Sequence, residues 1–170
     1  GVNYTHDRGV LATNVKKTGK YSMSFGKDDK EEDGGVFALE DGGVFFPLKS
    51  GTSYILKLNY YIKEHSDNNM GIRFVAAGYS NYYVAITNGS TGLTPEIVIT
   101  AEQAKEQKGK WQTLTFVLDT TKLAKNADGT DQFKELYCFL SSGQGWEYYI
   151  DDIAITEVPK GKVAVAFQTE

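Results

Sequence analysis

Two adjacent aspartates, Asp151 and Asp152, are the first residues of this sequence whose type and position suggest a chemical role. They lie in the middle of residues 146–157, where β-branched, aromatic and acidic residues alternate as they do in a strand. Because neighbours on a strand point to opposite faces, we expect one aspartate to point toward the core that the strand covers. An unpaired carboxylate there is too costly, so this position requires hydrogen bonds or a cation.

Residues that could form a catalytic centre are sparse. Glu64 and Glu147 are the strand-associated glutamates that could face a groove, but nothing pairs them as a glycosidase requires. The two histidines, His6 and His65, lie in polar loops and form no Ser-His-Asp, Cys-His or metal-binding arrangement. Cys138 is the single cysteine, which excludes an internal disulfide, and its apolar neighbours indicate a core residue. We therefore favour a protein that is not an enzyme.

The composition narrows the class of protein further. A chain of 170 residues is long enough for one domain with a hydrophobic core. Its formal net charge of -4 argues against a surface that binds nucleic-acid phosphates. No apolar run approaches the length of a membrane span. Tyrosine is the most frequent aromatic residue, with 11 copies, and its apolar ring with a polar tip suits binding through exposed rings.

The residues with possible chemistry must be positioned by strands, and residues 54–63 form the most informative one. Every second side chain is apolar or aromatic, which predicts one core face and one polar face. The expected core residues are Tyr54, Leu56, Leu58, Tyr60 and Ile62. The expected outward residues are Ile55, Lys57, Asn59, Tyr61 and Lys63.

Similar alternation and turn residues predict roughly ten short strands in all. The other predicted strands are 10–15, 21–25, 71–77 with 79–87 as its hairpin partner, 96–100, 111–119, 136–141, 146–157 and 163–167, together with a hairpin over 33–45. Residues 101–108 are expected to form at most two helical turns. This pattern predicts an all-β protein, an antiparallel β-sandwich or jelly roll with little or no helix. We assign residues 1–158 to the sandwich and 159–170 to a terminal strand or to the start of a linker or next domain.

Three motifs occur in a familiar order. The first is Gly51-Thr-Ser-Tyr54, which leads into the long strand. The second is Gly109-Lys-Trp111, which opens a strand in the middle of the chain. The third is Tyr149-Ile-Asp-Asp-Ile-Ala-Ile155. Together they resemble carbohydrate-binding modules of the β-sandwich group that contains families 4, 9, 16 and 22, over about residues 19–157.

This resemblance implies a jelly roll of two antiparallel sheets and non-catalytic binding of polysaccharide. Such modules are usually attached to the catalytic domain of a secreted enzyme that degrades plant polysaccharide. The resemblance therefore implies a secreted or cell-surface location as part of a larger protein, with a polysaccharide and a catalytic domain as partners. Many members also hold a structural calcium ion, for which Asp151 and Asp152 are the best anchors here. A hydrogen-bonded or salt-bridged aspartate pair is the alternative.

In the implied fold, the outward residues of one sheet form a shallow groove. A pyranose ring requires an aromatic platform and planar hydrogen-bonding groups. Trp146 follows a glycine-rich turn, so we expect its ring to contact ligand, whereas Trp111 is expected to be structural and Tyr149 to be partly buried. For Tyr61, a solvated strand position is the alternative to binding. The predicted ligand-binding residues are Lys57, Asn59, Tyr61, Arg73, Tyr79, Tyr82, Tyr83 and Trp146.

Three functions remain open from the sequence. The first is a polysaccharide-binding module whose ligand is xylan or β-glucan in the first place and starch-type α-glucan in the second. The second is a small jelly-roll glycoside hydrolase. The third is a structural or adhesion sandwich without a sugar site.

Overall fold

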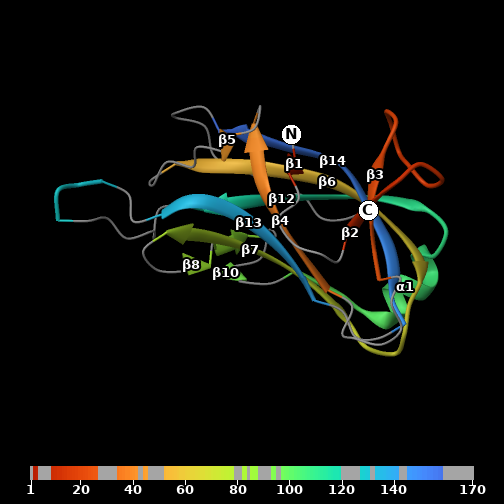
Figure 1. Ribbon diagram of the computed structural model, residues 1–170. Coiled ribbons are helices and arrows are strands. Elements are labelled where there is room, and N and C mark those ends of the chain that lie inside the picture. The colour runs from red at the N-terminus through yellow and green to blue at the C-terminus, as the bar shows by residue number, and fades with distance from the viewer. Residues whose placement is uncertain are drawn as a thin grey trace.

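The computed structural model consists of two antiparallel sheets packed face to face (Figure 1). It describes residues 2–3, 9–26, 34–41, 44–45, 52–78, 82–83, 85–87, 93–94, 97–119, 127–130, 133–141 and 145–158. The predicted ligand residue Tyr79, the predicted strand 163–167 and the segment 159–170 lie outside these residues. The predicted antiparallel β-sandwich is confirmed.

Sheet A has the strand order β1-β4-β13-β7-β11, with β5 paired to β4 and β8 paired to β7. Its strands are β1 (Val2–Asn3), β4 (Gly34–Asp41), β5 (Val44–Phe45), β7 (Met70–Gly78), β8 (Tyr82–Tyr83), β11 (Ile97–Ile99) and β13 (Phe133–Ser141). The hairpin predicted over 33–45 is confirmed, because Glu40 lies opposite Phe45 in the antiparallel pair β4–β5.

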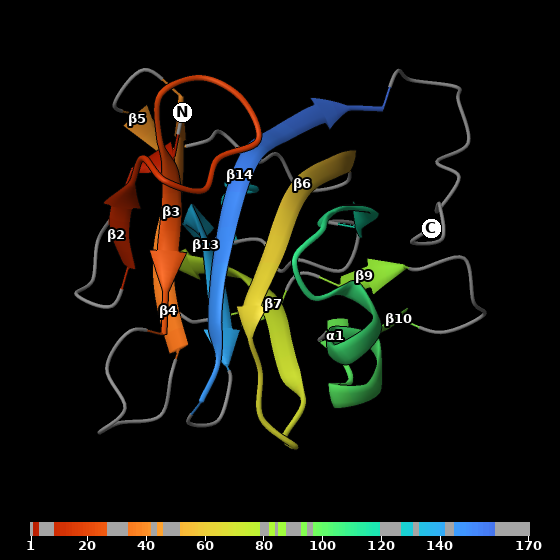
Figure 2. The same cartoon turned by 90° about the vertical axis from the view of Figure 1, so that its right-hand side faces the viewer.

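Sheet B has the strand order β10-β9-β12-β6-β14-β3-β2 and lies in front in Figure 2. Its strands are β2 (Gly9–Ala12), β3 (Ser22–Phe25), β6 (Ser53–Glu64), β9 (Ala85–Thr87), β10 (Leu93–Thr94), β12 (Trp111–Asp119) and β14 (Glu147–Glu157). The long strand β6 is central and pairs with both β12 and β14. The strands predicted at 54–63, 111–119 and 146–157 are therefore confirmed to within one residue.

The prediction of a single strand over 79–87 is wrong. Tyr83 of β8 lies opposite Val75 of β7 in sheet A, as the predicted hairpin requires. Thr87 of β9 instead lies opposite Val117 of β12 in sheet B. The segment contributes to both sheets, because alternation along a sequence specifies the two faces of a strand but not its partner.

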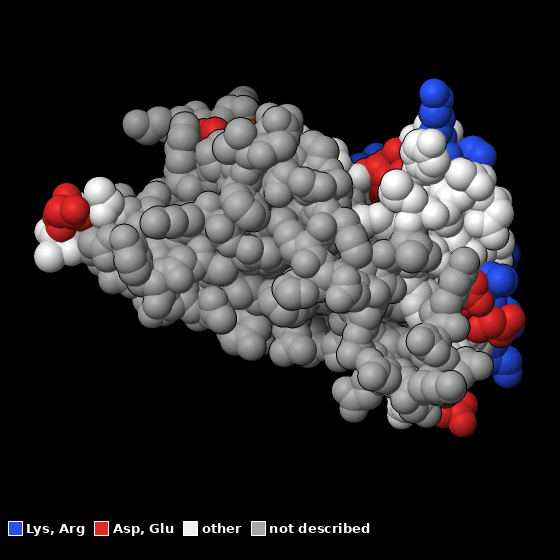
Figure 3. All heavy atoms as spheres, viewed as in Figure 1, with Lys and Arg blue, Asp and Glu red and all other residues white. Residues whose placement is uncertain are grey.

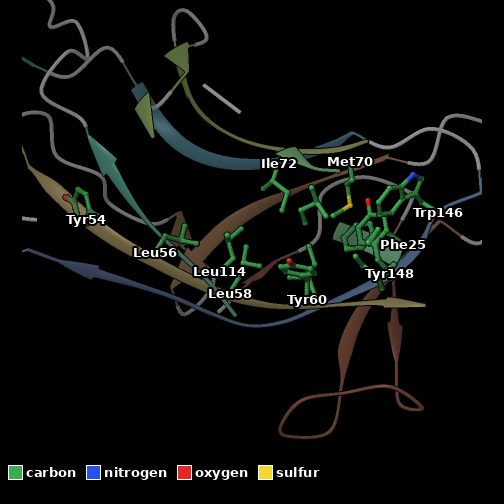
Figure 4. Packing of buried hydrophobic residues seen from close by; sticks show 14 residues of the cluster. Phe25, Tyr54, Leu56, Leu58, Tyr60, Met70, Ile72, Leu114, Trp146 and Tyr148 are labelled. Atoms are coloured by element: carbon green, nitrogen blue, oxygen red, sulfur yellow. The ribbon is translucent and has the colours of Figure 1, made fainter. Parts of the chain in front are cut away.

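The hydrophobic core lies between the sheets (Figure 4). All five inward residues predicted on β6 are buried, from Tyr54 to Ile62. Sheet A contributes Met70 and Ile72, which lie above the β6 side chains in Figure 4. At about 25 cal/mol for each Å² of apolar surface removed from water, this contact is the main stabilising term of the sandwich. The alternation of β6 thus determines which face of sheet B points away from the core.

The helix α1 (Ala101–Gln107) precedes β12 and begins at a capping box. The Thr100 side chain accepts a hydrogen bond from the Gln103 backbone N–H, and the Gln103 side chain accepts one from the Thr100 backbone N–H. At the other end, the Tyr60 hydroxyl donates to Gln107 Oε1 at 2.7 Å, which ties α1 to β6. Among the described residues, no helix is long and apolar enough to span a membrane.

The Tyr60 hydroxyl makes stability depend on alkaline pH. Burial raises the pKa of Tyr60 to about 12, from an ordinary value of 10.0. Since the folded protein retains this proton where the unfolded chain loses it, the stabilisation is present below pH 10 and is lost as pH rises toward 12. We expect the free energy of unfolding to fall by about 2 kcal/mol more for the wild type than for Tyr60→Phe over this range. Urea unfolding of both proteins at several alkaline pH values measures this difference, and parallel curves would contradict it.

Candidate functional site

The outer face of sheet B carries three of the predicted ligand residues, all on β6. Lys57 is exposed and Tyr61 is half-buried, whereas Asn59 is only 6% exposed. The Asn59 amide forms hydrogen bonds within the protein. Its Oδ1 accepts a hydrogen bond from the Thr113 hydroxyl at 2.7 Å, and its Nδ2 donates to Asp152 Oδ2 at 3.3 Å. Asn59 therefore connects β12 to β14, and we no longer assign it to ligand binding.

A β-bulge changes the direction of the aspartate pair on β14. Asp151 lies opposite Asn59 and Ala154 lies opposite Lys57, so β14 has one residue more than β6 in this interval. Asp152 has a φ of 51°, in the left-handed region that residues with a side chain rarely adopt.

Both carboxylates consequently lie on the outer face. Ile150, before the bulge, is buried in the core, and Ile153, after it, packs against the same core. The prediction that one aspartate points inward is wrong, because the extra residue breaks the strict alternation on which it rested.

The aspartate pair binds the loop between β2 and β3, which lies in front of β14 in Figure 2. Asp151 Oδ2 accepts hydrogen bonds from the backbone N–H groups of Lys17 at 2.8 Å and Thr18 at 3.2 Å. Asp151 Oδ1 accepts one from the Asp152 N–H at 2.8 Å. Asp152 Oδ1 accepts one from the Thr18 hydroxyl. With Asn59 on Asp152 Oδ2, each of the four carboxylate oxygens accepts a hydrogen bond from the protein.

These bonds leave a poor site for calcium. The ion takes six to eight oxygen ligands and is usually held by several carboxylates. In the part of the chain that the structure describes, no group of three or more His, Cys, Asp or Glu residues could hold a metal ion. The described residues therefore do not fit calcium at Asp151 and Asp152, and they agree with the alternative of a hydrogen-bonded pair.

We expect the aspartate pair to stabilise the protein without a metal. Asp151→Ala should lower the free energy of unfolding by about 1–3 kcal/mol, because two backbone donors of the β2–β3 loop lose their acceptor. The exposed Asp67 provides the control substitution, with a change within about 0.5 kcal/mol. EDTA should leave the melting temperature of the wild type unchanged. A drop with EDTA that calcium reverses would show that a metal site exists after all.

The outer face of sheet B also contains buried residues beside exposed ones such as Lys57, Thr113 and Ala154. Tyr149 lies opposite Tyr61 at an outward position, and yet it is 0% exposed. Ser22, Ser24 and Val117 also occupy outward positions and are buried. Burial of Tyr54, Tyr60 and Tyr149 confirms the prediction that these three rings are buried.

Trp146 is not a surface residue. Its side chain is 0% exposed and belongs to the core cluster with Phe25 and Tyr148 (Figure 4). Its ring centroid lies 6.0 Å from that of His65. The prediction that this ring contacts ligand is wrong. Burying an indole ring releases a large hydrophobic free energy, which determines the position of the Trp146 side chain. The glycine-rich turn before it does not prevent this burial.

Sheet A carries a second set of candidate positions. Ile72 of β7 is buried in the core, and Arg73 and Val75 follow it on the same strand. Tyr83 and Tyr137 flank Val75 on the two neighbouring strands, and Phe139 lies opposite Arg73. This row of four positions, Arg73, Tyr83, Tyr137 and Phe139, is called the sheet A row below. Three aromatic residues and an arginine thus occupy neighbouring register positions across β8, β7 and β13.

The predicted ligand residues are therefore divided between two sheets. Lys57, Asn59 and Tyr61 belong to sheet B, and Arg73 and Tyr83 belong to sheet A. Tyr82 lies opposite Ala76 of β7 in the register of sheet A. Tyr137 and Phe139 were missed, because a run of apolar residues around Cys138 indicates a strand buried on both faces. Their alternation with Cys138 was the signal that could have identified them.

Sheet A is curved. The ribbons of β7 and β13, above the core residues in Figure 4, bow toward the core, so the outer side of this sheet is concave.

At the end of the molecule that carries α1, acidic and basic side chains are intermixed (Figure 3). Lys108 pairs there with Glu64 at 2.7 Å.

Solved structures that resemble this fold include carbohydrate-binding modules of the β-sandwich type. One is the CBM22-1 xylan-binding domain of Paenibacillus barcinonensis Xyn10C, with a TM-score of 0.55 and 13% identity over 94% of this chain and 88% of that chain. Another is the family 30 module of the cellulosomal cellulase Cel9D-Cel44B of Clostridium thermocellum, with a TM-score of 0.53 and 16% identity over 91% and 85% of the two chains.

A family 16 carbohydrate-binding module matches with a TM-score of 0.52 and 12% identity, over 88% of this chain and 85% of that chain. No protein-family model and no curated protein sequence matches this chain. At these identities the likeness establishes a shared fold. The resemblance to the group that contains families 16 and 22 is thereby confirmed at the level of the fold.

Proposed function

We propose that this protein is a non-catalytic polysaccharide-binding module that holds an extended chain on the concave outer face of sheet A. The ligand is a plant polysaccharide, with xylan or β-glucan as the first candidate and starch-type α-glucan as the second. The module acts within a secreted or cell-surface protein and brings a catalytic domain of the same chain to its substrate.

The sheet A row carries this proposal, in which alternation along β7 from the buried Ile72 turns Arg73 and its neighbours in the register to the outer face. A pyranose ring has an apolar C–H face, for which Tyr83, Tyr137 and Phe139 provide aromatic residues. Its hydroxyls require planar donors, and Arg73 carries five N–H groups in a fixed geometry. Adjacent strands lie about 4.8 Å apart, so the row across three strands has a length of about 10 Å, comparable to two sugar residues. The fold shared with xylan-binding domains adds support.

Affinity electrophoresis tests the proposal. We expect migration of the wild type to be retarded in gels that contain soluble xylan or mixed-linkage β-glucan, and to be unaffected by dextran. Retardation by soluble starch instead would support the second ligand. Reducing-sugar release from the same polysaccharides would favour the glycoside hydrolase. If no polysaccharide retards the protein, the proposed function is wrong and a structural sandwich becomes the better account.

A further inference from the structure

One aromatic cluster on sheet B is independent of the sheet A row. Trp111, Tyr61 and Tyr149 lie side by side in register across β12, β6 and β14. The ring centroids of Tyr61 and Trp111 are 5.5 Å apart at an interplanar angle of 55°. Tyr149 contacts Tyr61 edge-on, with centroids 6.0 Å apart. Tyr149 is fully buried, whereas Tyr61 and Trp111 are half-buried and retain exposed surface.

The buried tyrosine fixes the position of the exposed rings. Tyr149 cannot move without loss of burial, and its hydroxyl lies 3.4 Å from Glu147 Oε1. The turn after α1 borders the Tyr61 ring, because the Gly109 N–H donates to the Ile62 carbonyl at 2.9 Å. A Cβ at Gly109 would lie 3.8 Å from the Tyr61 hydroxyl, its one neighbour within 4 Å. The two half-buried rings, tilted by 55° to each other, thus form a packed aromatic platform with open space beside the phenol group.

Charged groups with unused hydrogen-bonding capacity border this platform. Lys63 Nζ donates to Glu147 Oε1 at 3.0 Å, and the two side chains are 48% and 17% exposed. Among the described contacts, Glu147 Oε2 has no donor and Lys63 uses one of its three N–H groups. An ammonium group and a carboxylate oxygen are therefore available as donor and acceptor beside aromatic faces. Vicinal hydroxyls of a sugar match such a pair, since each hydroxyl both donates and accepts.

We infer that Trp111, Tyr61, Lys63 and Glu147 form a second sugar-binding site, which takes one or two residues of an oligosaccharide on the sheet opposite the proposed groove. A pyranose ring stacks on Trp111 and Tyr61, Glu147 Oε2 accepts from one hydroxyl, and Lys63 donates to its neighbour. This inference rests on the proposed function for the class of ligand but not for the site. Two sites on opposite faces let one module contact two polysaccharide chains, which raises its apparent affinity for an insoluble substrate.

Tryptophan fluorescence separates the two sites, because the chain has 2 tryptophans and the sheet A row has none. Trp146 is fully buried and gives a constant background, so a change on titration reports on Trp111. We titrate the wild type with xylohexaose, cellohexaose and maltohexaose, and measure emission, acrylamide quenching and heat by calorimetry. We expect a saturable emission change and reduced quenching, both absent in Trp111→Ala. Glu147→Gln should weaken the same signal by about tenfold, since it loses a charged acceptor.

The outcomes distinguish this site from the groove. Heat of binding without any fluorescence change overturns the second site and leaves the proposed groove intact. A fluorescence change that Tyr137→Ala leaves unaltered supports the second site, and a failure of Tyr137→Ala to reduce the heat then argues against the groove. Neither heat nor fluorescence change with any of the three sugars overturns both. Tyr21→Ala, an aromatic 53% exposed next to β3, is the control and should change neither readout.

Discussion

Gly26→Ala should destabilise this protein more than the same substitution at Gly19, Gly109, Gly129 or Gly145. A Cβ at residue 26 would lie 1.8 Å from the Trp146 carbonyl oxygen and 2.8 Å from its carbonyl carbon. Both atoms belong to the backbone that enters β14, so neither can rotate away. Gly26 also has a φ of 80°, which a residue with a side chain rarely adopts. We expect the free energy of unfolding to fall by about 3–5 kcal/mol, the sum of an overpacking term and a backbone term.

Gly19→Ala is the matched control. Gly19 has a φ of 64°, and a Cβ there would have no atom within 4 Å. It should cost about 1 kcal/mol from the backbone conformation alone. Thermal and urea unfolding of both variants separate the contact from the conformation. If Gly26→Ala is as stable as Gly19→Ala, the close approach of β3 to Trp146 is wrong. If Gly26→Ala does not fold, a folded Gly19→Ala still isolates the contact as the cause.

The second large effect concerns binding by the sheet A row. We expect Tyr137→Ala to weaken binding of soluble xylan or β-glucan by at least about tenfold, since aromatic residues at the centre of an interface carry much of its energy. Arg73→Lys keeps the charge but loses the planar donors, and it should weaken binding by a similar factor. The proposed function places both residues on the ligand side of sheet A, so we expect the melting temperature to change little.

Isothermal titration calorimetry measures this effect, and thermal unfolding of each variant shows that it is folded. Tyr21→Ala is the control, because this exposed ring precedes β3 in the other sheet. A loss of affinity in Tyr21→Ala as large as in Tyr137→Ala would mean that the effect is not specific to the row. Wild-type affinity in both Tyr137→Ala and Arg73→Lys would show that the sheet A row does not bind the polysaccharide.

Local pattern predicted the sandwich well, because each face of its strands has a distinct environment. Residues 54–63 show why. Five apolar or aromatic residues at every second position can be buried on one side only, and the structure buries all five. The capped helix at 101–107 was also within reach, since Thr100 and Gln103 have the spacing of a capping box.

The candidate site was harder to predict, because it depends on which strands are partners. Tyr61 and Arg73 were both predicted to face outward in one groove, but β6 and β7 belong to different sheets. Asp152 shows a second limit. A single bulged residue with a φ of 51° brings both aspartates to one face. A sequence pattern that assumes strict alternation of the two faces cannot predict such a bulge. Trp146 shows a third, since its flanking glycines suggested exposure, whereas the core takes up the ring.

Backbone NMR tests the central claim most directly. Amide chemical shifts of the isotopically labelled protein, recorded during titration with xylohexaose or the hexasaccharide of whichever polysaccharide retards the protein, locate the bound chain. We expect saturable changes concentrated in β7 and β13, around residues 71–78 and 133–141, with smaller changes at 61 and 111 from the second site. Binding that leaves the amides of β7 and β13 unshifted would contradict the account, because the polysaccharide would then lie elsewhere on the sandwich.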